Sequence, residues 1–107
     1  MEIIYSFYKI MEEIELDLRF LRGFDEEKAA KFKTLLEQIV DEWADKDYIP
    51  KALAGLFIDY YLALDAASTM YDEETRNKVL DFADHMTELM RKCVNQPNIY
   101  ERYEDEE

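Results

Sequence analysis

Glycine, proline and cysteine are scarce in this chain of 107 residues, which contains two glycines, two prolines and one cysteine. So few turn-forming residues argue against a fold of many short strands and favour long helices. The single cysteine, Cys93, cannot form a disulfide within the chain, so the disulfide framework of a small secreted domain is excluded. We therefore expect one helical domain in a reducing compartment, the cytoplasm.

Basic residues are also few, because 13 Lys and Arg stand against 26 Asp and Glu, a formal net charge of -13 at pH 7. Binding to nucleic-acid phosphates or to an anionic membrane surface requires the opposite sign. No basic and apolar signal segment opens the chain. The most apolar stretch, residues 50–68, contains Asp59 and Asp65, each costing roughly 2.5 to 3.5 kcal/mol at a bilayer centre. We expect no direct nucleic-acid contact and no membrane span, and the charge favours a basic protein as partner.

Apolar residues recur at helical spacing in four segments. The predicted helices span about 2–22, 25–46, 50–70 and 72–94. Asp25 and Asp72 are placed to cap the second and fourth helices, and Gly23 suits the left-handed position after the first. Four helices with short connections predict an all-α, antiparallel up-down four-helix bundle, a single domain over residues 1–97 with a short acidic C-terminal tail at 98–107.

The third helix has more apolar surface than a bundle needs. Leu53, Tyr60 and Leu64 share one face, and Ile58 and Leu62 lie on the other. We expect a self-association seam along this helix, either against another helix of the chain or in a homodimer; its residues are Gly55, Ile58, Asp59, Leu62 and Ala66.

Asp59 would be desolvated in that seam and would need a partner such as Arg19, Arg22 or a group from a second subunit. Asp65 lies nearer a polar edge, where we expect it to be solvated.

Two pairs of acids, Glu12-x-x-Glu15 and Glu42-x-x-Asp45, follow one another along the first two helices. Their spacing resembles the paired acidic motifs of all-α nucleoside triphosphate pyrophosphohydrolases of the MazG type. The resemblance implies a Mg²⁺ ion held by carboxylates that converge between helices. The helical phase opposes this reading, because Glu12 points away from the apolar stripe of its own helix.

A second polar constellation lies in the fourth helix, where Asp81, Asp84, His85 and Glu88 stand at three- and four-residue spacing. Histidine with carboxylates at such spacing can bind zinc. This patch lies opposite the apolar stripe of the same helix, so we expect it to face water and to hold no metal. No phosphate-binding loop and no nucleophile motif is present, so the sequence predicts no catalytic residue and no cofactor.

The function that these observations favour is a non-catalytic acidic binding protein. It would dock on and block a positively charged partner, a nucleic-acid-handling protein or a toxin, as a phage anti-defence inhibitor or an immunity protein does. Its carboxylates would imitate phosphates. The acids predicted to contact the partner are Glu12, Asp41, Glu42, Asp45, Asp81, Asp84 and Glu88. Two alternatives stay open: the Mg-dependent pyrophosphohydrolase, and a structural or assembly subunit that uses the third helix.

Overall fold

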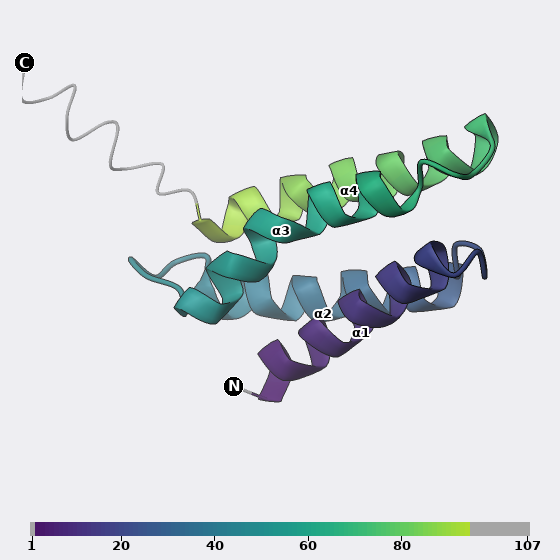
Figure 1. Cartoon of the computed structure of the whole chain (residues 1–107). Helices are drawn as coiled ribbons and strands as arrows, with labels where there is room; N and C mark the ends of the chain where they lie inside the picture. Colours follow the sequence, from purple (N-terminus) through teal and green to yellow (C-terminus); the bar gives the residue numbers. More distant parts are fainter. Residues whose placement is uncertain (1, 95–107) are drawn as a thin grey trace, which may run out of the picture.

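The chain forms four helices in the computed structural model, which describes residues 2–94. The helices are α1 (Glu2–Arg19), α2 (Glu26–Trp43), α3 (Lys51–Ala67) and α4 (Glu73–Val94) (Figure 1). Each helix runs antiparallel to the one before it, which confirms the all-α up-down four-helix bundle. The predicted tail at 98–107, and the stop of the fourth helix at 95–97, lie outside the residues that the structure describes.

The bundle consists of two helical hairpins, α1 with α2 and α3 with α4, laid against each other (Figure 1). Across the hairpins α1 contacts α3 and α2 contacts α4, while α2 and α3 lie on a diagonal. Because the two turns lie at the same end, α1 and α3 run in the same direction, as do α2 and α4. The sequence predicts the alternation of direction but not which helices become neighbours.

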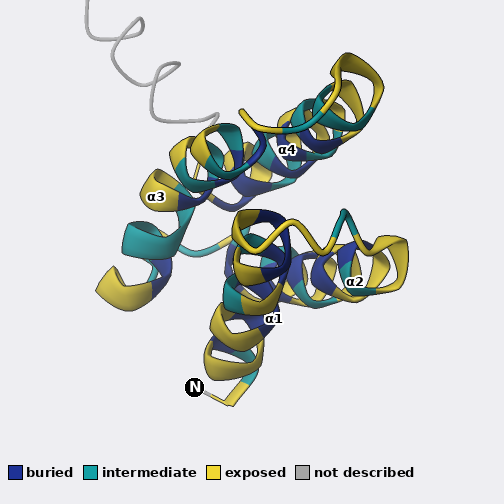
Figure 2. Cartoon of the chain, turned by 45° about the vertical axis from the view of Figure 1, so that its right-hand side comes forward, coloured by how far each residue is buried: buried dark blue, intermediate teal, exposed yellow. Residues whose placement is uncertain are grey.

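One aromatic side chain from each helix meets at the centre of the core. The ring of Phe32 in α2 lies 4.5 Å from Phe7, 5.4 Å from Phe82 and 6.3 Å from Tyr60, measured between centroids. Phe7, Phe32 and Tyr60 are all buried. Figure 2 shows the same pattern along the helices, with buried residues on the inward sides and exposed residues on the outward turns. Phe32 therefore touches a ring from each of the other three helices.

The predicted caps hold the starts of α2 and α4. The Asp25 carboxylate accepts hydrogen bonds from the backbone N–H groups of Glu27 and Lys28, and Asp72 accepts one from Thr75 at 2.8 Å. These side chains satisfy donors that the first turn of a helix leaves free. Both capping predictions are confirmed.

The first helix ends at Arg19, earlier than the expected Arg22, because a reversing turn follows it. The backbone N–H of Arg22 donates to the carbonyl of Asp17 at 2.7 Å, and that of Leu21 donates to Leu18 at 3.1 Å. This pair of bonds is a Schellman turn, which requires a left-handed residue. Leu21 takes that conformation, with φ of 58°, and it is 64% exposed although its spacing from Leu18 would place it on the apolar side of the helix.

Gly23 also has a positive φ, of 97°, two residues beyond the Schellman position. Its left-handed conformation is confirmed, but it shapes the loop that leads to Asp25 and not the end of the helix. Two other helices also end earlier than predicted. The helix α2 ends at Trp43 and not at Lys46, and α3 ends at Ala67 and not at Met70.

Replacing Phe32 with Ala is expected to lower the free energy of unfolding by about 3 to 5 kcal/mol, because it opens a cavity where the four helices meet. Urea denaturation followed by circular dichroism measures the change. The control is Met70→Ala, at a side chain that is 80% exposed, where we expect a change within about 0.5 kcal/mol. A similar small change for both variants would contradict the central position of Phe32.

Replacing Leu21 with Gly is expected to raise the free energy of unfolding by roughly 0.5 kcal/mol. Relief of left-handed strain, about 1 to 2 kcal/mol, exceeds the added entropy of the unfolded chain, about 0.4 to 1 kcal/mol. Thermal denaturation at neutral pH measures the difference. The matched control is Phe20→Gly, because Phe20 is 65% exposed and lacks a positive φ; that variant should be destabilised. Destabilisation by both changes would contradict the strain at Leu21.

Candidate functional site

The acids of α4 are exposed, with Asp84 at the edge of the groove between α3 and α4. Asp81, Asp84 and Glu88 are exposed, and none forms an ion pair with a residue that the structure describes. His85 is exposed beside them, and its Nδ1 lies 2.8 Å from the backbone carbonyl oxygen of Asp81, four residues earlier. The expected solvated face of this helix is therefore confirmed.

The acids of α2 gather near its C-terminal end. Asp41, Glu42 and Asp45 are exposed, and they too form no ion pair within residues 2–94. The helix α4 lies beside α2, and the groove between them is also lined by Lys33 and Lys92. The outer surface of these two helices is thus rich in free carboxylates, with lysines among them.

Glu12 stands apart from the other predicted acids. It lies on α1, which is diagonal to α4 in the bundle, so the seven acids do not share one continuous face. Its carboxylate accepts a hydrogen bond from the Tyr8 hydroxyl at 2.6 Å and lies 4.0 Å from the Nζ of Lys9. The bond to Glu12 also raises the pKa of the Tyr8 phenol, since it favours the protonated hydroxyl.

The four acids of the pyrophosphohydrolase pattern do not converge within the chain. Because α1 and α2 form an antiparallel hairpin, Glu42 lies level with the start of α1, and the 1.5 Å rise per residue separates it from Glu12 by roughly 15 Å along the axis. Glu15 instead pairs with Arg19 at 3.6 Å. In the part of the chain that the structure describes, no three His, Cys, Asp or Glu residues are grouped to hold a metal ion.

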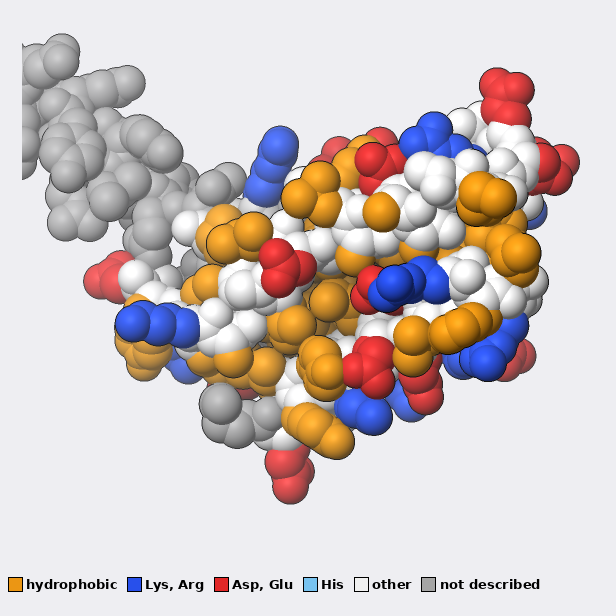
Figure 3. Space-filling model, viewed as in Figure 1, with side chains coloured by type: hydrophobic (Ala, Val, Ile, Leu, Met, Phe, Trp, Pro, Cys, Tyr) orange, Lys and Arg blue, Asp and Glu red, His pale blue; other side chains and the backbone are white. Residues whose placement is uncertain are grey.

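The outer face of α3 has no neighbour among the residues that the structure describes. Ile58 is 71% exposed and Leu62 is 68% exposed. Asp59 and Ala66 are also exposed, and a Cβ added to Gly55 would meet nothing within 4 Å. Hydrophobic side chains gather over α3 and in the hollow beside it in Figure 3. Within residues 2–94 the predicted seam is therefore open, and none of the described helices fills it.

Two expectations about acids on α3 are corrected in part. Arg19 and Arg22 bind Glu15 and Asp17 and do not pair with Asp59, so of its expected partners only a group from a second subunit stays a prediction. Asp65 is not merely solvated, since its Oδ1 accepts a hydrogen bond from the Arg76 guanidinium at 2.7 Å. That ion pair links α3 to α4.

An open, mostly apolar groove of about 520 Å³ runs between α3 and α4 on one flank of this face. Its lining includes Ala54, Phe57, Ile58, Tyr61, Asp84, Met90, Arg91 and Val94. Beneath it the Tyr60 hydroxyl bonds to the carbonyl of Ala83 and to Thr87, and burial raises the pKa of Tyr60 to about 12. The charge of Asp84 raises the pKa of Tyr61. Such a groove suits apolar side chains more than acid–base chemistry.

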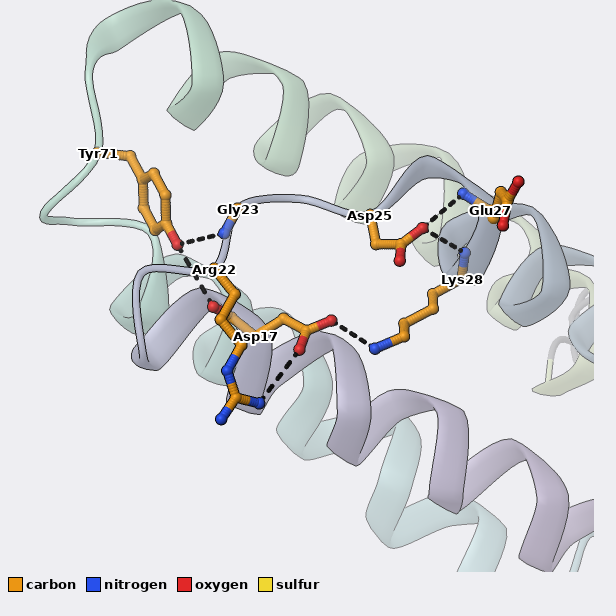
Figure 4. Close-up of polar contacts among 7 residues, drawn as sticks. All are labelled: Asp17, Arg22, Gly23, Asp25, Glu27, Lys28 and Tyr71. Carbon is orange, nitrogen blue, oxygen red and sulfur yellow. Dashed lines mark hydrogen bonds and ion pairs between the residues drawn. The ribbon is translucent and has the colours of Figure 1, made fainter.

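A polar cluster that the sequence analysis missed ties the two turns together (Figure 4). Asp17 is buried on α1, and its carboxylate accepts a hydrogen bond from the Nζ of Lys28 at 2.6 Å, with Arg22 at 3.6 Å. Nearby, the Tyr71 hydroxyl donates to the carbonyl of Leu18 at 2.8 Å and accepts from the N–H of Gly23 at 3.1 Å.

The sequence contains a signal for this cluster. Asp17 follows Ile14 by three residues and precedes Leu18, so it stands on the apolar stripe of its helix. A carboxylate at such a position requires a cationic partner. The cluster is structural in character, because each of its groups binds another group of the chain.

Comparison with known proteins finds no match to any family model, any curated protein or any solved structure. Among the helices described, none combines the length and the apolar character needed to cross a bilayer.

Replacing Asp17 with Asn is expected to destabilise the protein by about 1 kcal/mol at neutral pH, the typical net contribution of one hydrogen bond. The hydrogen bond from Lys28 lowers the pKa of Asp17, so its contribution is complete above the ordinary Asp pKa and disappears as the pH falls through the lowered value. Urea titrations between neutral pH and pH 2 should therefore show the two proteins converging in acid. The control Asp41→Asn, at an exposed and unpaired carboxylate, should change stability little. A difference between Asp17→Asn and the native chain that stays constant with pH would contradict the ion pair.

Proposed function

We propose that this protein is a non-catalytic acidic binding protein that docks on a positively charged protein and blocks its site. The partner class is a basic nucleic-acid-handling protein or a toxin, whose phosphate-binding or basic surface the carboxylates of this chain occupy. In that role it would act as a phage anti-defence inhibitor or an immunity protein does, in the cytoplasm. This role is argued from charge and surface chemistry.

The observation that carries the proposal is the set of exposed carboxylates without an ion pair on α4, on α2 and just beyond the C-terminal end of α2. Asp41, Glu42, Asp45, Asp81, Asp84 and Glu88 form no ion pair with any residue in the described range, and the chain as a whole carries a net charge of -13. Carboxylates without an ion pair lose no internal cation when they meet a cationic surface, and of these acids Asp84 interacts with the Tyr61 hydroxyl. They also accelerate encounter with such a surface through long-range attraction.

The spacing of the acids on α4 suits a partner that presents a row of cations. Asp81, Asp84 and Glu88 follow at three and four residues, so their carboxylates stand about one turn apart, near 5 Å, with Asp84 at the edge of the α3–α4 groove. Neighbouring phosphates of a nucleic-acid strand have a comparable spacing. A protein that binds phosphates in a row would therefore accept this ridge in their place.

Removing three of these charges is expected to weaken binding to the partner roughly tenfold at low salt. Each exposed charge contributes several tenths of a kcal/mol to binding, and the three together give about that change in the dissociation constant. The variant combines Asp45→Asn, Asp81→Asn and Glu88→Gln. The partner is first captured on tagged protein from the source organism at low and at high salt, then purified for titration by calorimetry. Binding of the native chain should weaken as salt rises.

The matched control removes the same charge elsewhere, with Glu2→Gln, Glu13→Gln and Glu26→Gln, all exposed positions on α1 and the first turn of α2. It should lose much less affinity than the first variant. Equal losses would show that net charge alone matters and that the α2–α4 surface is not the site. Recovery of no basic protein at either salt would overturn the proposal, and nucleotide hydrolysis with Mg²⁺ would then be assayed.

A further inference from the structure

The outer face of α3 presents large apolar side chains that meet no neighbour among residues 2–94. We define the α3 stripe as Gly55, Ile58, Leu62 and Ala66, which recur at three- and four-residue spacing. Ile58 and Leu62 are 71% and 68% exposed, in the middle of the stripe. Small residues at its two ends leave room for a helix backbone to approach closely, since a Cβ on Gly55 meets nothing within 4 Å.

The charges at the two ends of the stripe differ in sign. Lys51 begins α3, and Arg91 lines the groove at the same end because α3 and α4 run antiparallel. Neither base forms an ion pair with a residue described in the structure. The opposite end carries Asp65, whose Oδ1 binds Arg76. Asp84 lies beside Tyr61, nearer the middle of the stripe. One end is thus basic and the other acidic.

We propose that the occupant of the α3 stripe is a second copy of the chain, related by a twofold axis and with the two α3 helices antiparallel. A twofold axis perpendicular to the helices places the basic end of each copy against the acidic end of the other. We take Ile58 to lie opposite the second copy's Leu62. Counting the rise of about 1.5 Å per residue from that pair, Arg91 of one copy then lies at the height of the second copy's Asp65. That carboxylate has an oxygen that Arg76 does not use, and it can accept the additional hydrogen bond.

The same arrangement includes a repulsive contact. Asp59 lies on the flank of the stripe away from α4, and near the twofold axis it approaches the Asp59 of the second copy. Two carboxylates in proximity repel each other, as do two chains with a net charge of -13. Burial of Ile58 and Leu62 must exceed this repulsion. We therefore infer a dimer that strengthens as salt is added, because salt screens the repulsion and leaves the apolar contact intact.

This inference does not depend on the proposed partner, and the two respond to salt in opposite directions. Docking on a basic protein weakens with added salt, whereas the α3 dimer strengthens. Failure of either proposal can therefore be recognised without reference to the other.

The first experiment is sedimentation equilibrium of the native full chain over a range of concentrations, at low and high salt and with a reductant present. The mass should rise from 12.9 kDa towards twice that value, at lower protein concentration when salt is high. Leu62→Glu should raise the dissociation constant by at least about tenfold, because it places a carboxylate against Ile58. Asp59→Asn should lower it.

The matched control is Tyr48→Glu, at a side chain that is also 68% exposed but lies between α2 and α3, off the stripe. It adds the same charge and should dimerise much as the native chain does. A native chain that stays at 12.9 kDa under all conditions would overturn the proposal. So would a Leu62→Glu variant that dimerises as well as Tyr48→Glu.

Orientation is tested by disulfide formation, which requires Cα atoms within about 7 Å. Chains carrying Ile58→Cys are mixed with chains carrying Leu62→Cys and oxidised, and each variant is also oxidised alone. The antiparallel dimer predicts faster cross-linking in the mixture than in either variant alone. Faster cross-linking of each variant with itself would indicate parallel α3 helices and overturn the antiparallel arrangement. The native chain, with only the buried Cys93, serves as the blank.

Discussion

The packing of Phe32 is the constraint on which the rest of the molecule depends. Its ring contacts one aromatic ring from each other helix, so the two hairpins meet at a single buried point. Once Tyr60 is fixed beneath this ring, with its hydroxyl bound to the carbonyl of Ala83, the rotation of α3 about its axis is fixed as well. Tyr60, Leu53 and Leu64 then face the core, and the helical period turns Ile58 and Leu62 towards solvent. The exposed stripe is thus a consequence of the core.

Helical phase explains how much of this structure the sequence predicts. It correctly separates the buried and exposed sides of α3 and α4, and the chemistry of Asp25 and Asp72 correctly marks where α2 and α4 begin. Phase gives the direction of a side chain relative to its own helix, but it does not identify the neighbouring helix. For this reason Asp65 was not expected to meet Arg76, and Asp59 was assigned partners that bind other acids.

The left-handed Leu21 was missed for a related reason. Gly23 is the residue that ordinarily accepts a positive φ, so sequence reasoning places the helix end beside it. In the structure the turn is set by where Asp17, Lys28 and Tyr71 join the two ends of the hairpins. That tertiary requirement moves the left-handed residue of the turn two positions earlier, from Gly23 to Leu21, which has a poor intrinsic preference for the conformation. Local propensity is thus overridden by contacts between segments distant in the sequence.

The acidic outer surface and the α3 stripe lie on different sides of the bundle, so the two proposed interactions are compatible. Asp81 and Glu88 point away from α3 on the outer side of α4, and the acids of α2 lie on a helix diagonal to α3. A twofold dimer through α3 would leave these carboxylates free and present them twice. A partner with two basic sites at a suitable separation would then bind both copies, and the second contact would form at a high effective concentration. In that arrangement weak individual charge contacts would suffice for tight binding. Self-association of this acidic protein would therefore increase its affinity for the partner.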